Sequence, residues 1–331
     1  MPYSHLNDEE RDVISKLHFS GLSRAAIARD LGRSTSTISR ELLRNCVRKG
    51  SHRYVHWQYI SSGASKLAKQ RRSAAKGKLP RLLEMPRLLS YIKQGLKQNW
   101  SPEQIAGRIR VDHPHSPTMR VSHQTIYQWL RADKQSGGSW YLCLRQSHRK
   151  RRKKYGSSLR RYRIQDQVSI DQRPKIVEAR KRLGDWEGDT VEGKNHQGRL
   201  LTLVDRKSRF TLALKLKSKF SHEVVGAIER ALKPFARHKR QTLTLDNGTE
   251  FTYFQQIQER LRTKVYFAHP YCSWERGTNE NTNGLLRQYF PKQTNFLEIS
   301  AQQLAAVVMR LNNRPRKCLS WRTPYEVFYA T

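Results

Sequence analysis

Apolar residues recur every three or four positions over the first 45 residues, which is the spacing of amphipathic helices. Three short helices are predicted there, and the apolar positions that define them are Val13, Ile14 and Leu17, then Ile27 and Leu31, then Ile38 and Leu42. Asn7 and Ser23 stand where helix N-caps belong, and Gly32 supplies a flexible corner. A helix, a short glycine-containing turn and a further helix make a helix-turn-helix pattern within residues 1–50.

The outward face of the third predicted helix is polar and basic. It carries hydroxyl side chains and guanidinium groups suited to DNA bases and phosphates, namely Ser34, Thr35, Ser36, Thr37, Arg40 and Arg44. The alternative is a three-helix bundle that contacts another protein. Because the outward face is basic rather than apolar, DNA binding is favoured.

Residues 84–133 repeat the helical spacing. Ser101, Pro102 and Gln104 form a capping-box start, and the apolar pairs that follow are Ile105 with Ile109 and Ile126 with Leu130. A second helix-turn-helix is expected here, although the long intervening stretch "VDHPHSPTMRV" leaves its geometry open. Its DNA-contacting residues are predicted to be His123, Gln124 and Arg131. His113 and His115 are not assigned to a metal, since no Cys or further His stands at ligand spacing.

From residue 176 onward the pattern changes to short strands. Three consecutive strands with tight connections predict an antiparallel meander over 184–193, 199–205 and 209–216. Two further strands, 240–246 and 264–268, alternate with helices over 222–232 and 253–261. The expected fold class is α+β and multidomain, with all-α helix-turn-helix modules followed by a mixed five-stranded sheet and flanking helices. A later apolar stripe, Leu304, Val307, Val308 and Leu311, is interpreted as core, with a dimer contact as the alternative.

Charge changes this picture most. The chain of 331 residues has 64 Lys plus Arg against 27 Asp plus Glu, a formal net charge of +37, so a polyanionic partner is expected. Residues 42–83 and 134–165 each hold eleven basic residues and no acid, and the second stretch contains "HRKRRKK". Both are interpreted as linkers that tighten on nucleic acid, with DNA contacts from Arg149, Arg151 and Arg152. A ribosomal or merely adhesive basic protein is the alternative.

These boundaries predict five segments. They are a helix-turn-helix domain at 1–50, a basic linker at 51–83, a second helix-turn-helix domain at 84–133, a basic linker at 134–175 and a catalytic domain at 176–331. No apolar run is long enough to span a membrane, and the amino terminus lacks a signal pattern. The four scattered cysteines form no C-x-x-C pair and fit a reducing prokaryotic cytoplasm, where the protein is expected near the nucleoid.

Three carboxylates stand out against this basic background. Asp189 lies in the first predicted strand, Asp246 ends the fourth in "TLDNGTEF", and Glu280 opens a late helix. If strands one and four are neighbours at the centre of the sheet, Asp189 and Asp246 lie side by side with Glu280 laid across them. Carboxylate oxygens on rigid elements are the ligands that Mg²⁺ prefers, and two such ions can activate attacking and leaving oxygens in phosphoryl transfer.

Other acids are assigned lesser parts. Asp205 ends a strand and is interpreted as a turn cap, with a metal ligand as the alternative. Asp185 and Glu187 share a strand face with Asp189 by period two, so one of them could support it. Glu192 and Glu250 are interpreted as solvated. For any single acid, a structural ion pair remains the alternative.

The chain from "GDWEGDTVEG" through "DNGTEF" to "WERGTNENTNGLLRQYF" resembles DDE transposases of the insertion-sequence-thirty (IS-thirty) family. Asp189, Asp246 and Glu280 match the family triad, with the family spacing of 33 residues between the last two. "LSRAAIARDLGRSTSTISREL", "WSPEQIAGRI", "VSHQTIYQWL" and "LNNRPRKCLSWRTPYEVF" also look like family segments in family order, so the resemblance covers nearly the whole chain.

The resemblance implies an RNase-H-like (retroviral-integrase-like) core that holds two Mg²⁺ ions, with Mn²⁺ as a substitute, through the triad. It implies binding of terminal inverted repeats, strand cleavage and strand transfer, with a circular or joined-end intermediate and a homodimer or higher multimer on DNA. Arg287 matches a basic position seven residues after the family Glu and is assigned to phosphate contact, with solvation as the alternative. Further assigned DNA contacts are Trp274, Arg276 and Asn283, although Trp274 could equally be a packing anchor.

Two other functions remain as alternatives. A non-catalytic helix-turn-helix regulator explains the charge and the first 165 residues, but gives no reason for the three carboxylates. A nonspecific RNase-H-like nuclease has no need of two sequence-reading modules. A DDE transposase accounts for both halves of the chain.

Overall fold

The computed structural model describes residues 5–49, 56–75, 80–145, 164, 166–218, 220–270 and 272–330. Internal contacts divide the chain into two compact units, Met1–Glu84 and Met85–Thr331. Within the described residues, no helix is long and apolar enough to cross a membrane. All four cysteines are free thiols.

The first unit is helical with a small hairpin. Its elements are α1 (Asp8–Phe19), α2 (Arg24–Asp30), α3 (Thr35–Asn45), β1 (Cys46–Lys49), β2 (His56–Tyr59), α4 (Ser61–Ala75) and α5 (Pro80–Leu83). Asn7 caps α1 in a capping box, and Ser23 and Ser34 cap α2 and α3 through their side chains. The predicted apolar positions meet in one core that includes Ile14, Ile27, Ile38 and Leu42. The helix-turn-helix prediction is confirmed.

Residues 56–75 are not the linker that the sequence predicted, because β2 and α4 form there. The α4 helix packs on α1, where Ser65 Oγ donates a hydrogen bond to Asp8 Oδ1 at 2.6 Å and Lys69 Nζ donates to Oδ2 at 3.2 Å. Arg71 donates to the side-chain oxygen of Asn45 at 2.6 Å. The acid that partners α4 lies in α1, outside the acid-free stretch, so local charge counting could not find it.

The second unit begins with three helices, α6 (Pro86–Lys97), α7 (Pro102–Asp112) and α8 (His123–Gln135), and the short 3-10 turns η1 (Pro117–Met119) and η2 (Trp140–Cys143). The predicted capping box of Ser101 and Gln104 is present. Ile105, Ile109, Ile126 and Leu130 are all buried, as the helical spacing predicted.

This helical module is joined to the last part of the chain by side chains of α7. Arg108 makes a two-pronged ion pair with Glu326, with both N–O distances at 2.7 Å. Lys317 pairs with Glu103 at 2.7 Å. The indole of Trp321 lies directly against the backbone of Gly107, where an added Cβ would come within 2.1 Å of the ring. The predicted domain at 84–133 therefore packs as part of the second unit.

The sheet of the second unit has five strands in the order β5-β4-β3-β6-β7. The strands are β3 (Asp185–Glu192), β4 (Arg199–Asp205), β5 (Thr211–Leu216), β6 (Thr242–Leu245) and β7 (Lys264–Phe267). The first three pair antiparallel, and β6 and β7 run parallel to β3. The predicted fold class, with its mixed five-stranded RNase-H-like sheet, is confirmed.

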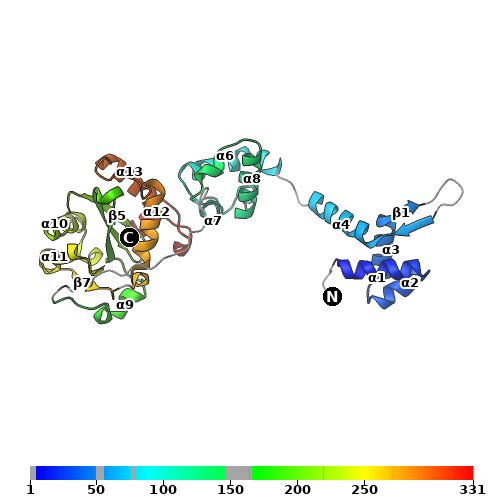
Figure 1. Ribbon diagram of the computed structural model, residues 1–331, viewed down its shortest axis with the longest axis horizontal. Helices are drawn as coiled ribbons and strands as arrows, with labels where there is room; N and C mark the ends of the chain where they lie inside the picture. Colours follow the sequence, from blue (N-terminus) through cyan, green and yellow to red (C-terminus); the bar gives the residue numbers. More distant parts are fainter. Residues whose placement is uncertain are drawn as a thin grey trace. The chain divides into compact units, whose positions relative to one another are not determined.

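Helices cover both faces of this sheet (Figure 1). One face carries α10 (Ser221–Leu232) and α11 (Phe254–Leu261), and the other carries α12 (Gly277–Tyr289) and α13 (Ala301–Asn312). Each face has its own apolar core, one that joins α10 to the strands and one that joins α12 and α13 to them. Leu304 and Leu311 of α13 are buried in the second core, so the interpretation of that stripe as core is confirmed.

Candidate active site

The pairing of β3 with β6 brings the two strand aspartates to the same place. Glu187 is paired with Thr244 in a parallel register, which puts Asp189 and Asp246 each two residues beyond that pair. Gly188, next to Asp189, leaves room for the Leu245 side chain, because an added Cβ would lie 2.6 Å from it. The sequence predicted this neighbourhood of Asp189 and Asp246.

Arg276 bridges the two carboxylates. Its Nη1 lies 3.3 Å from Asp189 Oδ1, and its Nη2 lies 3.1 Å from Asp246 Oδ2. Nη1 also donates to the carbonyl oxygen of Gly188 at 3.3 Å. The guanidinium is thus a single cation placed between two acids.

A hydrogen-bond chain fixes the other oxygen of Asp189. Asn283 Nδ2 on α12 donates to Asp189 Oδ2 at 2.7 Å, and Thr202 Oγ1 on β4 donates to Asn283 Oδ1 at 3.0 Å. The amide therefore supports the carboxylate in this structure, whereas the sequence assigned Asn283 to DNA. Thr202 was not singled out from the sequence, because its partner Asn283 lies 81 residues later on α12 and nothing local marks the contact.

The pKa values of both aspartates are raised, which favours their protonated forms. Burial raises the pKa of Asp189 to about 6, with Asp246 adding to the rise and Arg276 opposing it. Burial also raises the pKa of Asp246, again opposed by Arg276, while the charge of Glu250 adds to the rise. Two acids that resist ionisation and share one guanidinium favour a further or stronger cation at this place.

Glu187 anchors the helix that carries Glu280. Its buried Oε1 pairs with buried Arg206 at 2.6 Å, and its Oε2 accepts the backbone N–H of Asn279 at 2.9 Å. The sequence expected Asp185 or Glu187 to support Asp189, whereas Glu187 supports α12, and the side chains that contact Asp189 are those of Arg276 and Asn283. Asp185 instead pairs with Arg182 at 2.9 Å.

Glu280 is the fourth residue of α12 rather than its first, since the helix begins at Gly277. Its side chain is exposed and makes no hydrogen bond or ion pair with any described residue. Across the described ranges, no three His, Cys, Asp or Glu side chains are grouped closely enough to hold a metal ion. The donor chemistry of Asp189 and Asp246 suits a hard divalent cation, but Arg276 lies between them and Glu280 does not reach them.

The remaining acids take structural parts. Asp205 is buried and accepts bonds from the backbone N–H groups of Gly184 and Ser208, so its interpretation as a turn cap is borne out. The interpretation of Glu192 and Glu250 as solvated is wrong. Glu192 pairs with Arg199, and Glu250 accepts a hydrogen bond from Thr190 Oγ1 at 2.7 Å beside the candidate site.

Two of the DNA contacts assigned to α12 and to the turn before it, Arg287 and Trp274, differ in how free their side chains are to contact DNA. Arg287 donates to the backbone carbonyl of Glu192 at 2.6 Å and lies over the ring of Phe296, so it is held by the protein itself. Trp274 is 71% exposed, which leaves its ring open to a partner and disfavours the packing-anchor alternative.

The assigned contacts of the helical modules are placed at the surface. Exposed residues among them are Ser34, Thr35, Arg40, Arg44, His123, Gln124 and Arg131, while Thr37 is half-buried beside the cap Ser34. Arg149, Arg151 and Arg152 lie outside the described residues.

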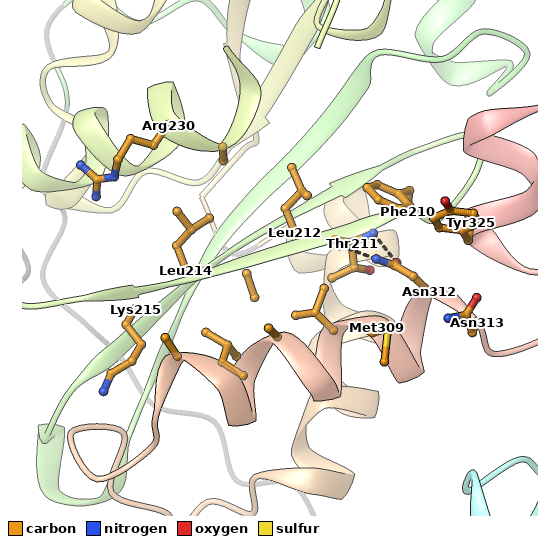
Figure 2. A pocket seen from close by; sticks show the side chains of 16 residues that line it. Phe210, Thr211, Leu212, Leu214, Lys215, Arg230, Met309, Asn312, Asn313 and Tyr325 are labelled. Atoms are coloured by element: carbon orange, nitrogen blue, oxygen red, sulfur yellow. Dashed lines mark hydrogen bonds between the residues drawn. The ribbon is translucent and has the colours of Figure 1, made fainter. Parts of the chain in front are cut away.

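A cavity lies elsewhere in the domain, away from the paired aspartates. A groove of about 890 Å³ runs along edge strand β5 between α10 and α13, two strands away from β3. Figure 2 shows its apolar lining, with Asn312 hydrogen-bonded to the backbone of Thr211 at one end. It carries no acid among its lining residues, so it is not a candidate for the chemistry of the paired aspartates.

The chain is similar to known protein families in both halves. An integrase core domain model matches residues 179–273, and a helix-turn-helix domain model matches residues 2–45. A transposase for insertion sequence element IS4351 from Bacteroides fragilis is 40% identical over 98% of this chain and 95% of its own length. The transposase InsI for insertion sequence element IS30C from Escherichia coli is 38% identical over 98% of this chain and 83% of its own length.

A solved structure also matches part of the chain. The catalytic core domain of BIV integrase aligns with a TM-score of 0.36 and 20% identity, over 44% of this chain and 93% of that one.

Proposed function

The chain belongs to the IS30 family of insertion-sequence transposases, and we propose that Asp189, Asp246 and Glu280 are the residues with which it cuts and joins DNA. It is a DDE-type enzyme that carries out transposition by DNA cleavage and strand transfer. The observation that supports the assignment most directly is the pair formed by Asp189 within β3 and Asp246 directly after β6, bridged by Arg276.

The three carboxylates are proposed to hold two Mg²⁺ ions, with Mn²⁺ as a substitute. When bound, such ions stabilise the charge that develops on the attacking and leaving oxygens of a phosphodiester. The chain's own part is to present ionised oxygens in a fixed place. Asn283 orients one oxygen of Asp189, and Glu187 ties down the start of α12, from which Glu280 extends.

For this site to fill, Arg276 has to release at least one carboxylate. Its Nε is already buried without a hydrogen-bond partner, so its place in the bridge is not fully satisfied. An arginine freed from Asp189 and Asp246 would lie at the rim of the site, where a DNA phosphate would pair with it. This role is consistent with the DNA contact assigned to Arg276 from the sequence.

The DNA partners are proposed to be the element's terminal inverted repeats and the target duplex. The helix-turn-helix unit at residues 2–45 supports DNA binding, and the exposed face of α3 is its proposed reading surface. Pairing two element ends calls for a homodimer or larger multimer on DNA. The proposed place of action is the nucleoid in a bacterial cytoplasm.

The catalytic assignment is tested with Asp246→Asn, incubated with the element's own end DNA and Mg²⁺. End binding in a gel-shift assay is expected to persist, while strand cleavage and strand transfer are abolished, because the neutral amide is a poor ligand for a hard cation. Glu259→Gln, which neutralises an exposed acid on α11, is the matched control and should cut normally. Full activity of the Asp246 variant would remove that residue from the catalytic set.

A non-catalytic regulator is not favoured. It would bind the same DNA, but similarity along nearly the whole chain to insertion-sequence transposases covers the paired acids as well as the DNA-binding unit. Nicking at a repeat end that a chelator stops would separate the enzyme from a regulator.

A further inference from the structure

Three arginines converge on a small pocket at the start of α12. The pocket has a volume of about 190 Å³, and its lining residues are Arg180, Arg209, Gly277, Thr278, Asn281, Thr282, Arg316 and Cys318. No acid is among them. Arg180, Asn281 and Cys318 are exposed, so the pocket opens to the surface.

These arginines have no carboxylate partner within the described residues. Arg209 Nη1 donates to Thr278 Oγ1 at 2.6 Å, and Arg316 Nη2 reaches the carbonyl oxygen of Leu311 at 3.4 Å. Glu187 is the acid whose negative charge acts on Arg180 and opposes the lowering of its pKa. Both carboxylate oxygens of Glu187 already have partners, which are the Arg206 guanidinium and a backbone N–H of α12.

Arg316 gives the strongest indication of a missing anion. The residue is 7% exposed, and its Nε is buried without a hydrogen-bond partner. Burial, with the charges of Arg314 and Arg209 adding to it, lowers the pKa of Arg316 to about 10, so the group still carries its charge at neutral pH. A buried guanidinium is expensive unless it is paired, which leaves this position short of one negative charge.

The pocket and the candidate active site lie on different faces of one helix. Thr278 and Thr282, four residues apart, face the pocket, whereas Asn279 and Asn283 face β3 and β4. An α-helix with its side chains is about 10 Å across. Neighbouring helix positions point about 100° apart, so the helix width sets only the scale of the separation, and at roughly 3.4 Å of rise per nucleotide it corresponds to about three nucleotides of one DNA strand.

We propose that this pocket binds one backbone phosphate of the DNA on which the active site acts, about three nucleotides from the bond that is cut or joined. Arginine forks and hydroxyl donors match the oxygens of a phosphodiester. The bound phosphate would fix the strand against α12, the helix that carries Glu280. The position of the pocket relative to the cut rests on the proposed function, whereas phosphate binding itself does not.

The first test uses the full chain without divalent metal and inorganic phosphate as the probe. Thermal unfolding is followed as phosphate replaces chloride at constant ionic strength. The wild type is expected to gain several degrees, and Arg180→Gln/Arg209→Gln is expected to lose most of that gain. Arg310→Gln, which removes an exposed positive charge on α13, is the matched control and should respond as the wild type does.

The Arg180→Gln/Arg209→Gln variant (the paired variant) also controls for loss of folding. Removing two uncompensated like charges is expected to leave its melting temperature in chloride equal to or above that of the wild type. Arg209→Lys should recover part of the phosphate response, because a cation returns to the pocket. An equal phosphate response in the wild type and the paired variant would overturn the proposal, as would equal losses in the paired variant and Arg310→Gln.

The second test separates DNA from a free anion. End duplexes carry a single neutral methylphosphonate at successive positions, and their affinity is measured without metal. One position about three nucleotides from the cut is expected to weaken wild-type binding at least fivefold and to have no effect on the paired variant. If no position loses its effect in that variant, DNA is not the ligand. Asp246→Asn should keep both responses, so a failure of the catalytic assignment would be seen separately.

Discussion

At the scale of single residues, the candidate site holds two carboxylates, and one guanidinium offsets part of their charge. Asp189 and Asp246 repel each other and are both penalised by burial, and Arg276 compensates for part of that cost. If the proposed metal site forms here, Arg276 would have to leave, and this would lower the affinity of the site for the metal when no DNA is present. Phosphate groups arriving with the substrate would draw Arg276 away, so metal and DNA would favour each other's binding.

The raised pKa of Asp189 predicts a stability effect that depends on pH. The unfolded side chain ionises near 3.8 and the folded one near 6, so the folded chain holds a proton that the unfolded chain has released between these values. Stability is therefore lost as pH rises from about 4 to 6, and the cost persists above 6. Asp189→Asn removes this cost and should raise the free energy of unfolding at pH 8 by up to about 3 kcal/mol.

Urea unfolding of the wild type and Asp189→Asn, without divalent metal, measures this difference. It should shrink toward zero below about pH 3, where the wild-type carboxyl is protonated in both the folded and the unfolded chain. Glu259→Gln, at an exposed acid of α11, is the control substitution. Asp189→Asn could instead lose stability relative to the wild type as the pH rises from 4 to 8. That result would mean that the ion pair with Arg276 outweighs the cost of burial.

The strand acids could be predicted from sequence because their signals are local. Period two along a strand, and the Asn247–Gly248 turn directly after Asp246, both stand within a few residues of the acid. Arg276 as a bridge and Glu250 as a neighbour could not be predicted, because each meets its partner across 30 residues or more. The exposure of Glu280 depends on its rotation about α12, which spacing alone does not determine.

At the scale of elements, α12 is positioned by a buried ion pair beneath its first turn. Glu187 and Arg206 are both almost fully buried, and the same carboxylate accepts a backbone N–H of the helix. The helix start itself was predicted three residues late. No side chain caps α12, and a 3-10 turn, η7 (Ser273–Arg276), runs directly into it, so the usual cap signal is absent.

Glu187→Gln is expected to lower the free energy of unfolding by about 2–3 kcal/mol, because it leaves the buried Arg206 charge without its main partner while keeping an acceptor for the helix. Equilibrium unfolding in urea measures it. Glu229→Gln, which breaks exposed pairs with Lys233 and Arg260, is the control and should cause no measurable change. Equal, small effects of the two substitutions would show that the buried pair is not what secures α12.

At the scale of the whole molecule, the boundaries between parts were the hardest to predict. Acid-free stretches were interpreted as linkers, yet α4 forms in one of them because its acidic partner lies in α1. The second helical module was expected to stand alone, yet α7 packs on a C-terminal segment more than 200 residues away. A count of charges along the chain reports local composition only, so it cannot reveal ion pairs between residues that are far apart in the sequence.

The contact between Gly107 and Trp321 gives a direct test of that packing. Gly107→Ala places a Cβ about where the indole ring lies, so it should lower the free energy of unfolding by roughly 1–3 kcal/mol despite the better helix propensity of alanine. Gly226→Ala, in the middle of α10, meets only the flexible end of Arg230 and should be neutral or stabilising. Urea unfolding compares the two.

Combining Gly107→Ala with Trp321→Ala separates a clash from a general effect on α7. If the indole is the obstacle, the alanine at 107 costs nothing further once the ring is gone, and the double variant matches Trp321→Ala alone. If Gly107→Ala is as harmless as Gly226→Ala in the wild-type background, α7 does not pack on the C-terminal segment in solution. The helical module would then be free to move relative to the catalytic sheet, and DNA bound to one would not be positioned for the other.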